Sequence, residues 1–180
     1  MRPVANAVDI VVGDVPDDGR RLSGQVAVEI LAEEGAEDIS PRGPITYELV
    51  VTRLGSTVTI QGNLETTVEA GCGRCARRFE IPIERAFDAV FVTADTGETD
   101  HAVELDESDL DLDYYGGDVI DGAQLLAEQI LLELPMKILC AEDCKGLCPT
   151  CGANFNENDC DCESLHDPRW ASLKDLRDRL

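Results

Sequence analysis

The sequence has few aromatic residues and no long apolar run, and each absence excludes a class of protein. Aromatic residues make up 4% of the 180 residues, so a core has to consist mainly of Val, Ile, Leu and Ala. No apolar run approaches the roughly 20 residues that cross a bilayer. The N-terminal stretch meets Asp9 and Asp14 early and has no long apolar segment. We therefore expect no signal peptide, no membrane partner and a cytoplasmic location.

Motifs of the common enzyme classes are missing as well. The chain contains no P-loop, no dinucleotide-binding glycine fingerprint and no G-x-S-x-G nucleophile elbow. It has two histidines, His101 and His166, whereas catalytic zinc sites normally use His or carboxylate ligands and keep a water position open. His166 follows Cys162 closely, and we interpret it as a surface residue rather than a metal ligand. We predict that the protein is not an enzyme and has no small-molecule substrate.

Positive charge is scarce. The formal net charge is −22, and residues 94–135 contain 13 acidic residues but no Lys or Arg. Such a surface repels nucleic-acid phosphates and anionic lipid, and it attracts basic proteins. Arginines cluster at Arg74, Arg77, Arg78 and Arg85, and two interpretations of them stay open. They contact RNA phosphates, or they neutralise nearby thiolates.

The apolar pattern predicts a sheet. Residues 45–92 alternate apolar and polar positions in three segments, which indicates antiparallel strands with one buried face. Gly55-Ser56 is expected to form a turn, and Gly62 a possible bulge. Shorter alternations near residues 8–12 and 26–30 indicate two further strands.

One helix is expected to cover this sheet. Residues 119–134 carry apolar side chains at helical spacing, with Asp118 or Asp121 as the N-cap. Pro135 ends the helix because proline lacks an N–H and clashes with the preceding turn.

These elements predict an α+β fold: an antiparallel β-sheet covered by a helix, followed by a cysteine-rich, zinc-bound C-terminal segment and a short terminal helix. The sheet domain comprises residues 1–135, with an acidic loop at 94–118 that holds at most one short strand near 103–105. Residues 136–180 form a metal-binding tail whose terminal helix begins after Asp167. We expect the tail to pack on the sheet domain through the C-G-R-C segment.

The strongest signal is the set of eight cysteines, because four thiolates satisfy one tetrahedral zinc ion. Six of the eight fall in a short C-terminal stretch as C-x3-C-x3-C-x2-C-x8-C-x-C, after an earlier C-G-R-C. In a reducing compartment, dense cysteines at this spacing indicate metal binding more often than disulfides. The predicted ligands of two zinc ions are Cys72, Cys75, Cys140, Cys144, Cys148, Cys151, Cys160 and Cys162.

Two partitions of these ligands into sites are compatible with the spacing. The favoured one keeps near cysteines together because short loops close at a lower entropic cost. It joins Cys148 and Cys151 to the C-D-C pair, and it joins the first two tail cysteines to the C-G-R-C pair. The rival partition pairs C-G-R-C with Cys148 and Cys151. Other interpretations are free buried thiols, a C-G-R-C redox dithiol, or a rubredoxin-like iron centre for electron transfer.

Several segments together resemble one protein family. They are C-G-R-C-A-R-R-F-E-I-P-I, the run from I-L-L-E-L-P-M-K to N-D-C-D-C, and the closing D-P-R-W-A-S-L-K-D-L. Over roughly residues 45–180 the chain resembles the YceD family, the large ribosomal RNA subunit accumulation proteins of bacteria and plastids. The resemblance implies a non-enzymatic role in the accumulation or maturation of large-subunit ribosomal RNA. The implied partner is a ribosomal protein or a large-subunit precursor particle, and a variant of this role is that of a chaperone for one basic ribosomal protein.

Overall fold

A computed structural model describes residues 8–26, 39–93 and 112–162 of this chain. The chain divides into two compact units, one of Met1–Ala70 with Glu80–Met136 and one of Gly71–Phe79 with Lys137–Leu180. The predicted division also had a boundary near residue 135, but it counted the C-G-R-C segment with the sheet. In the structure that segment belongs to the second unit.

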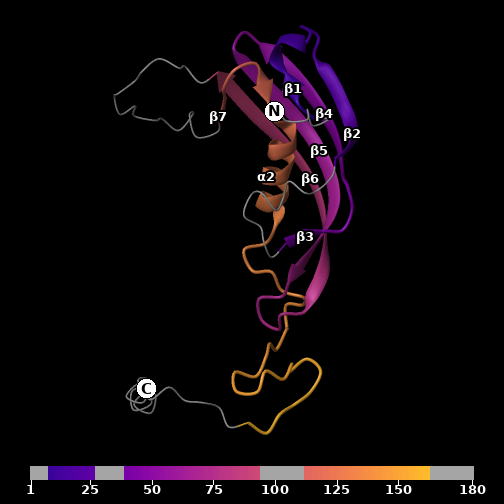
Figure 1. The fold of residues 1–180 in the computed structure, drawn as a ribbon, viewed down its shortest axis with the longest axis vertical. Coiled ribbons are helices and arrows are strands. Elements are labelled where there is room, and N and C mark those ends of the chain that lie inside the picture. Colours follow the sequence, from indigo (N-terminus) through magenta and orange to yellow (C-terminus); the bar gives the residue numbers. More distant parts are fainter. Residues whose placement is uncertain (1–7, 27–38, 94–111, 163–180) are drawn as a thin grey trace, which may run out of the picture. The chain divides into compact units, whose positions relative to one another are not determined.

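Three long strands form the centre of a six-stranded sheet in the first unit (Figure 1). They are β4 (Ile45–Leu54), β5 (Thr57–Gly71) and β6 (Arg78–Thr93). β4 and β5 pair antiparallel around the predicted Gly55-Ser56 turn, where Gly55 has a φ of 63°. Buried and exposed residues alternate along β4 and β5, as the period-two pattern predicts.

Shorter strands extend the sheet on both sides, in the order β2-β4-β5-β6-β7. β2 (Arg20–Val26) pairs antiparallel with β4, and β3 (Ile39–Pro41) pairs antiparallel with β5. β7 (Leu112–Tyr115) lies parallel to β6. The prediction of a purely antiparallel sheet is therefore wrong, and so is the assignment of these four residues to the acidic loop. A long connection between two strands permits parallel pairing, and intervening acidic residues hide the short apolar signal of β7.

A second, small sheet and the helix α2 complete the described part of this unit. β1 (Ile10–Val11) pairs antiparallel with β8 (Val119–Ile120), and a 3-10 turn, η1 (Val12–Asp14), follows β1. The helix α2 (Gly122–Glu133) begins later than predicted because Val119 and Ile120 pair as a strand. Asp121 is its N-cap, since one carboxylate oxygen accepts hydrogen bonds from the N–H groups of Ala123 and Gln124 at 3.0 Å each.

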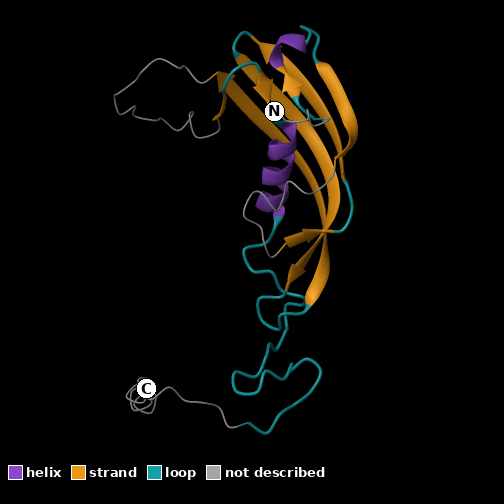
Figure 2. Cartoon of the chain, viewed as in Figure 1, coloured by secondary structure: helices purple, strands orange, loops and turns teal. Residues whose placement is uncertain are grey.

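The helix packs on the apolar face of the sheet, as predicted (Figure 2). Leu125, Leu126 and Ile130 of α2 share one buried cluster with residues of β4, β5 and β6. Gly62 lies in this face, and its register with Leu49 is continuous, so the predicted bulge is wrong. A Cβ at Gly62 would approach the Phe87 ring to 2.4 Å, so the glycine makes room for that ring.

Several predictions fall outside the described residues. They are the terminal helix after Asp167, the surface position of His166, any strand near 103–105, and the strand near 26–30 beyond Val26, which is the last residue of β2. Among the residues that the structure does describe, no helix combines the length and apolarity that spanning a membrane requires.

Candidate metal centres

The C-G-R-C segment forms a tight loop between β5 and β6, in the second unit. The Cys72 N–H donates to the Arg77 carbonyl at 2.9 Å, and the Ala76 N–H donates to the Cys72 carbonyl at 2.9 Å. Ala76 has a φ of 56°, which only glycine adopts without strain. This turn folds the backbone around the first sulfur of the pair.

The C-P-T-C-G segment repeats the same loop. The Cys148 N–H donates to the Ala153 carbonyl at 2.8 Å, and the Gly152 N–H donates to the Cys148 carbonyl at 2.9 Å. Gly152 takes the position of Ala76 and has a φ of 75°. Two segments far apart in the sequence thus each form a knuckle of the same geometry. Turns of this kind point backbone amides at metal-bound sulfurs.

Each knuckle meets one further pair of cysteines. The sulfur atoms within each foursome all lie within 4.8 Å of one another. The two foursomes are the knuckle site, Cys72, Cys75, Cys140 and Cys144, and the tail site, Cys148, Cys151, Cys160 and Cys162. This is the favoured partition, and the rival partition is wrong as a description of where the sulfurs lie. All eight side chains are free thiols in this structure, so a disulfide does not account for their grouping.

Distances in the knuckle site match those of a four-sulfur metal centre. The Sγ atoms of Cys72 and Cys144 are 3.8 Å apart, and those of Cys75 and Cys140 are 3.7 Å apart. A tetrahedral zinc ion with Zn–S bonds of about 2.3 Å places its sulfurs about 3.8 Å from one another. The donor set therefore fits zinc in number, chemistry and spacing.

The first cysteine of each knuckle is prepared to ionise. Hydrogen bonds from backbone groups of Cys140 and Cys75 lower the pKa of Cys72 to about 6. Backbone groups of Cys151 and Thr150 lower the pKa of Cys148 in the same way, also to about 6. Metals bind thiolates, so these two sulfurs are in the form that a metal ion would bind at neutral pH.

One other thiol in each foursome has a strongly raised pKa instead. Burial and the neighbouring thiols raise the pKa of Cys140 to about 12. The thiol of Cys151 and burial raise the pKa of Cys162 to about 12. Four sulfurs this close cannot all carry charge without a cation between them, so metal binding has to release protons.

Other side chains hold the knuckle site in place. The Arg74 guanidinium donates to the carbonyl oxygens of Cys144 and Glu142 at 2.8 and 3.2 Å. The Gly73 N–H donates to the Ile138 carbonyl at 2.8 Å. Burial raises the pKa of Cys144, but hydrogen bonds from the Asn156 side chain and the Gly146 backbone outweigh it, and the pKa is lowered.

The two sites differ in exposure. Cys72, Cys75 and Cys144 are nearly inaccessible to solvent, and Phe79 and Leu139 pack against them. In the tail site, Cys151 and Cys162 are exposed. The knuckle site is therefore the more protected of the two.

A family model described as "Large ribosomal RNA subunit accumulation protein YceD" matches residues 60–177, more than half of the chain. The chain belongs to the YceD family.

Similar proteins of known sequence agree with this membership. An uncharacterized protein of Mycobacterium tuberculosis (strain ATCC 25618 / H37Rv) is 30% identical to this YceD-family chain over 132 residues, 73% of this chain and 61% of the relative. The chloroplastic large ribosomal RNA subunit accumulation protein YCED homolog 1 of Zea mays is 30% identical over 157 residues, 74% of this chain and 54% of the relative. The homolog 1 of Arabidopsis thaliana is 24% identical over 176 residues, 86% of this chain and 55% of the relative. The chain thus spans little more than half the length of these relatives, and no solved structure matches it.

The arginines predicted to form one basic cluster do not share one environment. Arg74 is engaged with the backbone at the knuckle site, whereas Arg77 and Arg78 are exposed. Arg85 faces α2, where it donates to Gln129 and Glu133 at 3.0 and 2.8 Å. Arg85 belongs to the first unit, where its side chain joins β6 to the helix.

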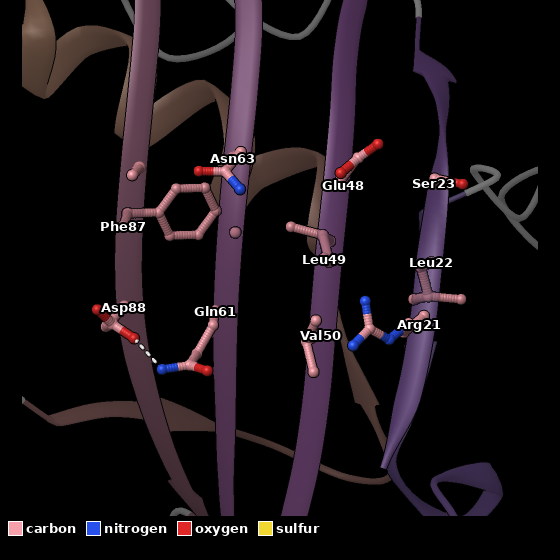
Figure 3. Close-up of a pocket in the computed structure, with 12 residues that line it drawn as sticks. Arg21, Leu22, Ser23, Glu48, Leu49, Val50, Gln61, Asn63, Phe87 and Asp88 are labelled. Carbon is pink, nitrogen blue, oxygen red and sulfur yellow. Dashed lines mark hydrogen bonds between the residues drawn. The ribbon is translucent and has the colours of Figure 1, made fainter.

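A pocket on the sheet offers a different candidate site (Figure 3). It is lined by side chains of β2, β4, β5 and β6, and Gln61 Nε2 donates to Asp88 Oδ1 at 2.7 Å. Its exposed charges, among them Arg21 and Glu48, have both signs, and its lining contains no cysteine or histidine. Such a surface has neither the thiolate or imidazole ligands that favour zinc nor the basic, aromatic character of an RNA-binding sheet.

Sequence reasoning missed the asparagines around the knuckle site. Asn156 Nδ2 donates to Cys144 Sγ at 3.3 Å, and the same nitrogen donates to Asn154 Oδ1 at 2.8 Å. The only local signal is that an N-x-N pair follows the second knuckle, and asparagines commonly build turns. The contact of Asn156 with Cys144 emerges only in the folded chain.

Proposed function

We propose that this chain is a non-enzymatic factor in ribosome biogenesis that supports the accumulation of large-subunit ribosomal RNA, with two structural zinc ions that hold its second unit together. The biological role is supported by membership of the YceD family and by the printed names of the Zea mays and Arabidopsis thaliana relatives. The zinc sites are supported by one observation above all: the eight cysteine sulfurs converge as two foursomes, each built on the same knuckle.

The ligand set favours structural zinc over catalytic zinc. Four thiolates fill all positions of a tetrahedral ion and leave none for a water molecule or a substrate. Residues 137–162 have almost no regular secondary structure of their own (Figure 2). Structural zinc contributes an apparent ~10–16 kcal/mol in small zinc peptides, which is enough to fold such a segment.

The charge of the chain supports a basic protein as its direct partner. A net charge of −22 repels the phosphates of RNA, and it attracts the Lys- and Arg-rich segments that ribosomal proteins use to bind RNA. In this proposal the factor contacts a basic ribosomal protein, alone or within a large-subunit precursor. RNA contact is limited to the exposed side chains of Arg77 and Arg78.

A rubredoxin-like iron centre is the second candidate, because paired knuckles with four cysteines suit iron as well as zinc. Exposure of Cys151 and Cys162 would let electrons reach the tail site. Protein purified from its own cell decides between the metals. We expect about two zinc ions per chain by elemental analysis and no visible absorption. Ferric thiolate absorbs strongly in the visible, so a coloured protein with iron in place of zinc would overturn the zinc assignment.

The biological role is tested by depletion of the protein in its own cells. We expect large-subunit ribosomal RNA to fall relative to small-subunit ribosomal RNA, and large-subunit precursors to accumulate in sucrose gradients. The wild-type gene should restore the ratio, whereas a variant with Cys75→Ser and Cys140→Ser should not. A matched control, Thr57→Ser at the first residue of β5, should restore it fully. An unchanged ratio after depletion would remove the biogenesis role, whatever metal the protein binds.

A further inference from the structure

Asn156 connects the two cysteine sites. It lies between Cys151 and Cys160, in the loop that joins the two halves of the tail site. Its side chain nevertheless reaches Cys144 of the knuckle site, to which Nδ2 donates at 3.3 Å. One residue therefore belongs to the loop of one site and contacts a ligand of the other.

The orientation of this amide is determined by its partners. The Lys145 backbone N–H can only donate, and it donates to Asn156 Oδ1 at 2.9 Å. The nitrogen end of the amide must then face the opposite way, toward Cys144 Sγ and Asn154 Oδ1. Both hydrogens of Nδ2 are used, so rotation of the amide would break all three hydrogen bonds.

A turn in the tail-site loop keeps Asn156 in position. The Asn156 N–H donates to Asn154 Oδ1 at 3.1 Å, and the Phe155 N–H donates to the Gly146 carbonyl at 3.0 Å. Asn154 accepts two further N–H groups at its carbonyl, from Glu157 and Asn158. A metal ion at the tail site closes both ends of this loop, and it thereby reduces the number of conformations open to Asn156.

We propose that Asn156 is a positioning residue that couples the two metal centres, so that metal at the tail site raises the affinity of the knuckle site for metal. The inference rests on the proposed metal sites. Its physical reason is that an N–H donor directed at a metal-bound thiolate stabilises the charge which that sulfur keeps in the complex. Closure of the tail-site loop favours the conformations in which this donor is in place. Coupling of binding sites is reciprocal, so metal at the knuckle site raises the affinity of the tail site by the same factor.

A double-mutant cycle on the full chain tests this coupling. Zn²⁺ affinity of the knuckle site is measured by chelator competition under reducing conditions. The four proteins are the wild type, Asn156→Ala, a tail-site variant with Cys151→Ser and Cys162→Ser, and the combination. Both cysteines are exposed, so serine leaves the buried clusters intact. We expect the tail-site variant to lose about tenfold in knuckle-site affinity when Asn156 is present, and less than about twofold when it is Ala.

A control and a spectroscopic signature separate positioning from a general loss of structure. Asn158→Ala keeps the backbone hydrogen bond of its turn and should behave as wild type. In protein loaded with ¹¹³Cd²⁺, Asn156→Ala should shift the knuckle-site resonance and leave the tail-site resonance in place. The ¹¹³Cd²⁺ measurement needs no cysteine substitution, so it tests the role of Asn156 even if the tail-site variant fails to fold.

The outcomes are distinct. A tenfold loss that persists with Ala at position 156 would place the coupling in the short backbone link between Cys144 and Cys148, and it would overturn the role of Asn156. A cycle with no coupling in the wild type would overturn it as well. A chain that binds neither Zn²⁺ nor Cd²⁺ at any cysteine would instead overturn the proposed metal sites themselves.

Discussion

The left-handed residue of each knuckle gives the sharpest test of the proposed metal-bound form, because the two sites carry different residues there. Ala76 and Gly152 follow the second cysteine of their knuckles and have φ values of 56° and 75°. A Cβ built on Gly152 meets nothing within 4 Å. Gly152→Ala therefore introduces backbone strain without a steric clash, and Ala76→Gly removes the same strain from the other site.

The expected magnitude follows from two opposing terms. An L-residue in the left-handed region costs roughly 1–2 kcal/mol relative to glycine. Replacing glycine by alanine recovers about 0.4–1 kcal/mol because the unfolded chain becomes less flexible. At the mid-points of these ranges, about 1.5 and about 0.7 kcal/mol, the net loss for Gly152→Ala is about 0.8 kcal/mol. Since about 1.4 kcal/mol corresponds to tenfold in affinity, we expect a two- to fivefold weaker tail site.

Ala76→Gly should change the knuckle site by the same factor in the opposite direction. The affinity of each site is measured by Zn²⁺ competition with a chelator, in backgrounds where two cysteines of the other site are serine. Each substitution should leave the Zn²⁺ affinity of the opposite site unchanged, apart from the coupling that Asn156 carries. Equal affinities for Gly152→Ala and its parent would show that the metal-bound tail site does not use the left-handed turn, and the knuckle reasoning would fail.

Three further predictions concern the sheet unit and the protons of the thiols. Gly62→Ala should lower the free energy of unfolding, measured in urea, by about 1–3 kcal/mol because the alanine methyl group clashes with Phe87. A second change, Phe87→Leu, should recover part of this loss. An unchanged urea midpoint for Gly62→Ala would contradict the clash. Asp121→Ala should cost about 1 kcal/mol in the same assay, whereas Asp121→Asn should cost only a few tenths, since Asn also caps helices well; equal losses would argue against the cap. Zn²⁺ affinity should fall as the pH falls, because Cys140 and Cys162 have pKa values raised to about 12, hold protons in the metal-free protein and lose them on binding. The affinity should fall roughly tenfold per pH unit for each proton released. A flat affinity profile between about pH 8 and about pH 6 would refute this prediction.

The parts of the fold that the sequence predicted are those with strong local patterns. The alternation in β4 and β5 is set by one buried face, and the cap at Asp121 needs only residues that follow it directly. β7 escaped prediction because four residues rich in acid and tyrosine carry little periodicity, and its parallel partner is distant in the chain. Gly62 was misread for a related reason: its neighbour Phe87 comes from another strand, so the sequence shows a missing side chain but not what occupies the space.

In the candidate site, too, local sequence determined some features and tertiary contacts determined the others. The cysteine spacing, the glycine that follows Cys151 and the number of thiols are properties of short segments. The sequence alone therefore determined which cysteines are candidate ligands and where the chain turns beside them. It did not determine which pairs meet, because both partitions satisfy four-sulfur chemistry. Tertiary contacts such as the Gly73 N–H to the Ile138 carbonyl, and Arg74 to Cys144, bring together cysteines 65 or more residues apart. The contact of Asn156 with the neighbouring site was decided in the same way, since a hydrogen bond depends on distance in space and the chain order leaves that distance open.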